Sequence, residues 1–282
     1  MATTPITATN LANWIPTVWS KEVLADVENN LVIAALFDRT YEGFVSEGGN
    51  VIVVPNLANI TASAVNTNGD MTLYNTVQNV TNINVNFKYD IGVAVDDVNK
   101  LQTNPKYFEK VRSKLAYGLA KQIDTNCAVQ FKTYSQVVGT TASALTEDTF
   151  ISAYEYLNAA NAPFDDRAWV LDPESITDLL KLDYFVRTDY APGANIHRTG
   201  FRGQWILGSP VYITTNNDIW GTSLEHVGGY FQREATALVV QMQPKFEVAR
   251  WPLRHSDLLI GLCVFGLEEM RDTFGVCINC RS

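Results

Sequence analysis

One alternating stretch limits, more than any other feature, what this chain can fold into. From Asn82 to Val95, apolar side chains occupy every second position, beginning at Ile83. A strict period of two is typical of a β-strand, and the fourteen residues at about 3.3 Å each would span roughly 45 Å. Because strands in compact domains have about five or six residues, we expect this strand to leave its own domain.

The residues before this strand predict the rest of a long hairpin. Val51-Ile52-Val53-Val54-Pro55 is a β-branched run, and Asn68-Gly69-Asp70 is a turn signal. Between Val51 and Phe87, Asp70 is the only charged residue. A two-stranded ribbon is marginally stable alone and exposes its pairing edges. The hairpin therefore fits a protein in which another subunit lies beneath it.

Composition excludes several classes of protein. The 282 residues, 46% of them hydrophobic, are enough for about two folded domains. The net charge of -9 has the wrong sign for a dedicated nucleic-acid binder. The first 20 residues lack the pattern of a secretory signal, and the apolar run 258–267 is about half the length of a membrane-spanning helix. We expect reduced, packing cysteines, including Cys277 and Cys280 in a terminal strand.

Apolar periodicity predicts two helices in the first half of the chain. One covers residues 17–37, after a polar N-terminal stretch. The other begins after Asn104-Pro105 and continues to about Lys132, which gives a rod of roughly 42 Å. One stripe of this helix contains Lys106, Lys110 and Lys114. The stripe is either a solvated helix face or a weak track that faces nucleic acid.

The second half of the chain predicts a small α/β layer followed by further strands. A helix over 146–160 begins at Thr146 as its N-cap, and Asp172-Pro173 begins a short helix after a strand at 168–171. Residues 189–204 are predicted to form a loop. Further extended segments are predicted at 205–213, 237–242, 246–248, 258–265 and 276–280.

No motif in the sequence carries recognisable catalytic chemistry. The chain has no glycine-rich phosphate loop, HExxH pair or GxSxG elbow. His197, His226 and His255 lack the spacing of metal ligands. The acid pairs 96–97 and 165–166 are adjacent in sequence, so in extended chain their side chains point apart and form no catalytic dyad. We therefore expect no enzyme activity, no metal site and no cofactor.

The order of these segments resembles that of the major capsid proteins of tailed bacteriophages, which have the Hong Kong 97-like fold. The resemblance covers nearly the whole chain and depends on order and spacing. The segments that carry it are Trp19 to Leu24, Gly48 to Pro55, the long helix after Asn104-Pro105, Arg167 to Pro173, Gly203 to Tyr212, and Phe265 to Ile278.

The resemblance implies an α+β fold with four parts. These are an N-terminal arm with a helix (1–40), an extended β-hairpin loop (41–95), a peripheral domain with a long spine helix (96–137 and 236–282) and an α/β axial domain (138–235). It also implies intersubunit contacts from the tip of the loop. The residues expected there are Asn68, Asp70, Met71, Leu73 and Tyr74.

The resemblance further implies a shell built from many copies of the chain, as pentamers and hexamers, around double-stranded DNA in the virion. Assembly would take place in the bacterial cytoplasm. Expected partners are a separate scaffolding protein, a portal protein and a decoration protein, with weak DNA contact through the lysine stripe. Some family members crosslink through a loop lysine, but residues 51–87 contain no lysine. We therefore expect a shell that is held together non-covalently.

Two other functions remain open from the sequence. An encapsulin nanocompartment has the same fold and a similar length but encloses cargo enzymes, so neighbouring genes would separate the two. A hydrolase with its site in the α/β layer is more remote. A soluble monomer that shows turnover and forms no large particles would favour the hydrolase.

Overall fold

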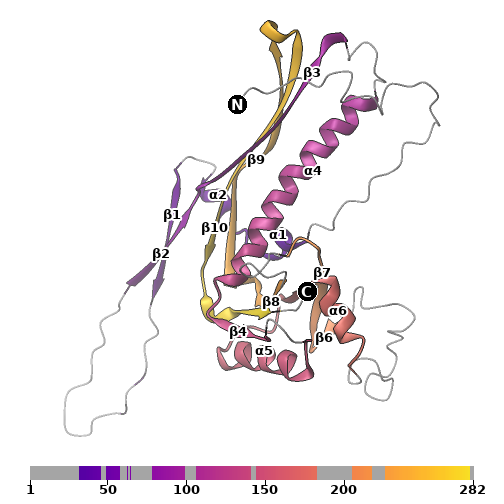
Figure 1. The fold of residues 1–282 in the computed structure, drawn as a ribbon. Coiled ribbons are helices and arrows are strands. Elements are labelled where there is room, and N and C mark those ends of the chain that lie inside the picture. Colours follow the sequence, from indigo (N-terminus) through magenta and orange to yellow (C-terminus); the bar gives the residue numbers. More distant parts are fainter. Residues whose placement is uncertain are drawn as a thin grey trace.

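The computed structural model describes residues 32–45, 49–57, 62, 64, 78–98, 106–140, 144–182, 205–217 and 226–279. Within these ranges the protein is an elongated α+β molecule with three sheets (Figure 1). The α+β class expected from the sequence is confirmed.

A three-stranded antiparallel sheet and one long helix form the elongated part of the molecule. The strand order is β3-β10-β9, with β3 (Phe87–Asp96) and β9 (Thr236–Trp251) on either side of β10 (Ser256–Glu269). The 24-residue helix α4 (Lys106–Val129) is about 36 Å long and lies along this sheet (Figure 1). Its Leu115, Leu119 and Ile123 are buried. The predicted long helix is confirmed.

A separate two-stranded ribbon extends from this body (Figure 1). It pairs β1 (Val51–Leu57) with β2 (Gln78–Asn84) in antiparallel register, with Val51 opposite Asn84. The prediction of a hairpin is confirmed for these residues. The predicted turn at 68–70 lies outside the described residues.

The prediction of one continuous strand from 82 to 95 is wrong. The strand breaks at Val85 and Asn86, and β3 then pairs with β10 of the body instead of continuing the ribbon. Val85 is buried and its amide donates to the carbonyl of Asn50 at 2.9 Å, which turns the chain from one sheet into the other. The alternating sequence pattern continues past the break because β2 and β3 each turn alternate side chains toward the protein interior. Only the first part of the alternating stretch belongs to the ribbon.

A six-stranded mixed sheet forms the other end of the molecule. Its order is β4-β11-β8-β5-β7-β6, with these bounds: β4 (Gln136–Val138), β5 (Arg167–Leu171), β6 (Trp205–Ile206), β7 (Ser209–Ile213), β8 (Val227–Gln232) and β11 (Gly275–Asn279). Helices α5 (Glu147–Ala159) and α6 (Pro173–Leu179) belong to this end (Figure 1). The resemblance placed β11 with the peripheral return strands, but it pairs with β8 and β4 here.

Short helices join these parts. They are α1 (Ile33–Leu36), α2 (Glu42–Val45) and the single 3-10 turns η1 (Gln130–Lys132), η2 (Arg233–Ala235), η3 (Pro252–Arg254) and η4 (Asp272–Phe274). Of the helix predicted over 17–37, the structure describes α1, and residues 17–31 lie outside the described part. The loop predicted over 189–204 also lies outside it.

Aromatic side chains fill the core where the parts meet. Phe37 contacts Phe131 and Phe231 edge-on, with ring centroids 6.1 and 5.2 Å apart. Trp169 and Tyr230 are stacked at 3.8 Å between adjacent strands of the six-stranded sheet. These buried rings supply a large apolar area and a defined packing geometry.

Local chemistry explains where α6 begins and why β9 is continuous. Asp172 accepts a hydrogen bond from the amide of Glu174, which confirms it as the N-cap of α6. Thr146 occupies the N-cap position of α5, but its side chain makes no capping bond and lies 3.1 Å from the hydroxyl of Thr149 instead. The two strands predicted over 237–248 are one strand, β9, because Pro244 lies on an edge strand where a missing donor is tolerated.

Candidate functional site: surfaces for assembly

The outer face of the β1–β2 ribbon presents unpartnered apolar side chains. Val53 is 60% exposed, and Val80 on the opposite strand is 55% exposed. Phe44 of α2 lines the same shallow groove as Val51 and Val53. The ribbon carries no charged residue in its two strands. An uncharged strip with exposed valines is suited to contact with another protein surface.

The inner face of the ribbon is fixed to the body. Ile83 is fully buried in a cluster with Ala237, Val239 and Val264, and Ile52 and Val54 pack against it. Gly266 of β10 makes this close approach feasible, since a Cβ there would lie 2.6 Å from the carbonyl oxygen of Asn84. The ribbon therefore leaves the body in a defined direction.

A polar cavity of about 550 Å³ lies at the base of the ribbon. Its walls come from the ribbon, η2 and the turn before β5, and they include Asp38, Asp166 and Glu234 beside Arg233 and Arg271. Charges of both signs line it. The turn itself has Asp166 in the left-handed region with φ of 57°.

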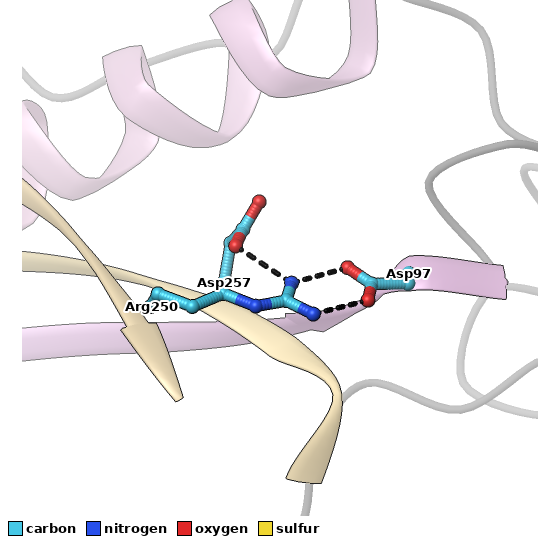
Figure 2. Close-up of polar contacts among 3 residues, drawn as sticks. All are labelled: Asp97, Arg250 and Asp257. Carbon is cyan, nitrogen blue, oxygen red and sulfur yellow. Dashed lines mark hydrogen bonds and ion pairs between the residues drawn. The ribbon is translucent and has the colours of Figure 1, made fainter. Parts of the chain in front are cut away.

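The distal end of the three-stranded sheet is held by one arginine. Figure 2 shows Arg250 of β9 between Asp97, just beyond β3, and Asp257 of β10. Both guanidinium Nη atoms lie 2.5 Å from the two carboxylate oxygens of Asp97, and Nη1 lies 3.0 Å from Asp257. Next to this network, η3 exposes 91% of Leu253, and the guanidinium of Arg254 lies 4.5 Å from the Trp251 ring.

Helix α4 places basic residues on its accessible side. Lys110 is half-buried, whereas Arg112, Lys114 and Lys121 are exposed. From Lys110 to Val129 the only acidic residue is Asp124, which is buried. Lys106 belongs to α4, but its side chain lies outside the described part. From Lys110 onward, the accessible face of α4 is therefore positive in a chain whose net charge is negative.

The loop-tip residues expected at intersubunit contacts lie outside the described residues. They are Asn68, Asp70, Met71, Leu73 and Tyr74. The sequence pattern missed Arg250 and the outer valines of the ribbon as candidates. The continuous β-branched run from Val51 to Val54 predicts a strand but not which of its faces is exposed, and Arg250 had no signal in the sequence.

The two histidines that the structure describes lie in different parts of the fold. Nδ1 of His226 lies 3.9 Å from Asp172, whose pKa burial raises. His255 adopts a left-handed conformation just after η3, and His197 lies outside the described residues. Within the described ranges, no group of three or more His, Cys, Asp or Glu side chains has the arrangement of a metal site.

The cysteines behave as small apolar side chains. Cys127, Cys263 and Cys277 are buried and are not joined in disulfides, which confirms the packing role predicted for Cys277, and burial raises the pKa of Cys127. Cys280 lies outside the described residues. Among the helices that the structure describes, none has the length and apolarity needed to cross a membrane.

Comparison with known proteins finds similarity in structure only. No family model and no curated protein sequence matches the chain. A chain from Mycobacterium phage Che8 superposes with a TM-score of 0.79 at 24% identity, covering 94% of this chain and 96% of its own. A chain from the capsid structure of cyanophage P-SCSP1u gives 0.74 at 16% identity, covering 98% and 95%.

A third structure is the asymmetric unit of the mature capsid of bacteriophage PhiM1. It matches with a TM-score of 0.69 at 12% identity over 93% of this chain and 92% of its own. The chain has a phage-capsid fold. The Hong Kong 97-like fold expected from the sequence is thus confirmed along nearly the full length.

Proposed function

We propose that this protein is the major capsid protein of a tailed bacteriophage and assembles, through pentamers and hexamers, into a non-covalent shell around double-stranded DNA. The observation that carries the proposal is the match of nearly the whole chain to capsid chains over nearly their whole length. A fold alone does not define a function, so the exposed surfaces matter as well.

The surfaces support self-association. The outer ribbon face offers Val53 and Val80, and the distal tip offers Leu253, at two places far apart on an elongated molecule (Figure 1). Contacts between different patches of identical copies are heterologous, and in a closed lattice many modest contacts act together. The loop tip from Asn68 to Tyr74 would extend the ribbon contact over the neighbouring subunit.

The four-part organisation proposed from the resemblance assigns these surfaces to the extended loop and the peripheral domain. The positive face of α4, with Lys106, Lys110 and Lys114, would touch packaged DNA weakly and without sequence preference. Scaffolding, portal and decoration proteins are the further partners of such a shell. The virion is the proposed location.

The test is assembly of the purified chain, alone and with a coexpressed scaffolding protein, followed by negative-stain microscopy and sedimentation. We expect closed shells. Deletion of residues 60–78 should leave a folded chain that fails to form them, because the ribbon contact is lost. Persistent soluble monomers of the full chain under all these conditions would refute the shell function.

A finer variant tests the ribbon surface. Val53→Asn with Val80→Asn removes the exposed apolar groups and leaves the buried face of the ribbon intact. We expect a change in monomer stability within about 0.5 kcal/mol, because exposed substitutions rarely cost more, together with a strong loss of shells. The matched control is Val248→Asn, on β9 and also exposed. Normal shells from the double variant would exclude this face as a contact.

A further inference from the structure

A row of side chains runs along the accessible side of α4. With about 100° of rotation per residue, four of them fall within about 60° of one another around the helix axis. They are Lys110, Lys114, Tyr117 and Lys121, and we call them the α4 row. Lys114 and Lys121 are exposed, and the other two are partly exposed. The stripe visible in the sequence ended at Lys114, so the structure adds Tyr117 and Lys121 to it.

The lysines of the row are not matched by acids at the positions where helices usually place them. A stabilising acid lies three or four positions from its lysine, and Lys114 has no acidic residue at either distance. Lys121 has one, Asp124. That carboxylate is buried, and its oxygens accept hydrogen bonds from the Ala34 amide at 3.0 Å and from Nδ2 of Asn216 at 3.1 Å. It is already engaged inside the protein.

The charges of the row also repel one another. Lys110 and Lys114 are four positions apart, a spacing at which like charges destabilise a helix. A solvated helix face normally interleaves acids and bases, which removes this repulsion. The row does not, although the chain as a whole has more acidic than basic residues. A polyanion bound along the row would relieve the repulsion.

The composition of the row favours nucleic acid over a protein partner. The cores of protein interfaces are depleted of lysine and are more apolar than the rest of the surface. From Lys110 to Lys121, a stretch that the structure describes throughout, no large hydrophobic side chain is exposed. The ring of Tyr117 lies 6.0 Å from the ammonium of Lys114, beside a charge. Lysine is a common ligand of phosphate groups, which it binds as a point charge.

The spacing of the row determines how many phosphates it can neutralise. Lys114 lies about 6 Å from Lys110 and about 10 Å from Lys121 along the helix axis. Duplex DNA carries one negative charge per about 1.7 Å of its length, so each ammonium can meet a phosphate of its own. Three such contacts release counterions from about three phosphates. The logarithm of the affinity should then fall with the logarithm of the salt concentration with a slope of about -2.7.

We propose that the α4 row binds the phosphates of duplex DNA, one phosphate per lysine, without reading the base sequence. Arg112 is also exposed on α4 but lies on the opposite side of the helix axis, so it takes no part. The inference rests on the proposed shell function for the source of the DNA. It deepens that function by adding Lys121 to the contact and by setting the number of phosphates.

Two substitutions form a matched pair for the test. Lys121→Gln and Arg112→Gln each remove one positive charge from an exposed position of α4, and glutamine is a good helix former. Binding of a short fluorescent duplex of mixed sequence to the soluble full chain is followed by anisotropy over a salt series. Circular dichroism confirms that each variant is folded.

We expect the wild-type affinity to fall about 40-fold between about 50 and 200 mM salt, as the slope implies. Lys121→Gln should make the slope less steep by about 0.9, whereas Arg112→Gln should leave it unchanged. The same change of slope in both variants would overturn the inference, because net charge and not the row would then govern binding. Failure of the wild-type chain to bind the duplex at the lowest salt would overturn it too.

A measurement on the unmodified protein locates the contact without any variant. Limited acetylation, analysed by mass spectrometry, should show that the duplex protects Lys110, Lys114 and Lys121. Lys245 of β9, with 68% of its side chain accessible, is the internal control and should react equally with and without DNA. Absence of protection along the row would overturn the inference. So would equal protection by polyglutamate at the same charge concentration, which would indicate an acidic protein partner instead.

These measurements separate the inference from the proposed function. If the chain forms no shells, the proposed function fails, and the binding result still decides whether the α4 row takes DNA. If shells form but the lysines of the row stay unprotected by the duplex, only the inference fails.

Discussion

Arg250 and Asp97 form a two-pronged ion pair between the two outer strands of the three-stranded sheet, 153 residues apart in sequence. These strands do not touch each other, because β10 lies between them. On β10, Asp257 is paired in register with Arg250 and also bonds to it. One guanidinium therefore joins the ends of all three strands, at the base of the turn that exposes Leu253 (Figure 2).

Arg250→Lys tests whether this network orders the tip. Lysine keeps the charge but lacks the planar fork that binds both oxygens of Asp97. The pair is partly exposed, with 46% and 39% of the two side chains accessible, so we expect little change in global melting temperature. Amide exchange over 250–257 should accelerate several-fold. Lys245→Gln, which removes another exposed ion pair of β9, is the control, and equal exchange in both variants would contradict the prediction.

Gly266→Ala tests the attachment of the ribbon. The new methyl group would lie 2.6 Å from the Asn84 oxygen and 3.1 Å from Cα of Val85, and both of these are backbone atoms. We expect a loss of about 1–3 kcal/mol in the free energy of unfolding, as for other overpacked sites, measured by urea denaturation. Gly92→Ala is the matched control, since its nearest neighbour would be 3.7 Å away. Equal free energies of unfolding for the two variants would show that the backbone at the base of the ribbon shifts to accommodate the methyl group at little cost.

Glu269→Gln tests a pH dependence at the junction between the two larger sheets. Burial raises the pKa of Glu269, and Asp272 raises it further. The folded state therefore holds this proton more tightly than the unfolded state, so the group's contribution to stability falls as pH rises through its folded pKa. The variant should gain melting temperature at pH 7 relative to wild type, and the gain should vanish well below pH 4.5, the ordinary value.

Asp272→Asn tests a carboxyl group whose pKa is shifted in the opposite direction to that of Glu269. Burial alone would raise the pKa of Asp272, but hydrogen bonds from the hydroxyl and amide of Ser135 lower it below 3.8 overall. The ionised carboxylate thus stabilises the fold above its unfolded pKa, and this contribution is lost as pH falls through the folded value. We expect Asp272→Asn to be less stable than wild type at pH 7. The same sign of change in both variants would contradict these assignments.

Arg167→Lys tests a buried cation at the start of β5. Arg167 is 2% exposed and donates to Pro163, Ala162 and Asn158 at 2.6 to 2.8 Å. A lysine has no guanidinium fork and leaves at least one of these acceptors unsatisfied, which should cost about 1–3 kcal/mol in chemical denaturation. Arg233→Lys, at an exposed position, should stay within about 0.5 kcal/mol of wild type. A loss as small as that of the control would show that water replaces the missing donors.

Local patterns predicted the elements that are stabilised by their own sequence. The apolar steps of Leu115, Leu119 and Ile123 correspond to the buried face of α4, and Asp172 caps α6 as its position indicated. Local patterns also carried the family resemblance whose fold the structural comparison confirms.

The candidate surfaces were only partly predictable. The β-branched run 51–55 indicated a strand, but which of its faces is buried depends on Ile83 of the paired strand packing into the body. The lysine stripe of α4 was visible in the sequence, whereas the network around Arg250 was not. Its three members come from separate strands, and no spacing along the chain relates Asp97 to Arg250.

The sequence by itself determined where α4, α5 and β1 lie along the chain, because apolar periods and β-branched runs reflect the structure of one segment. Only the tertiary structure decided that the alternating stretch breaks at Val85, that β11 joins the six-stranded sheet and that Asp124 meets Ala34 and Asn216. Those outcomes depend on which distant segments pack together. An alternating pattern looks the same whichever sheet it joins, so the choice is made by contacts between segments and not within them.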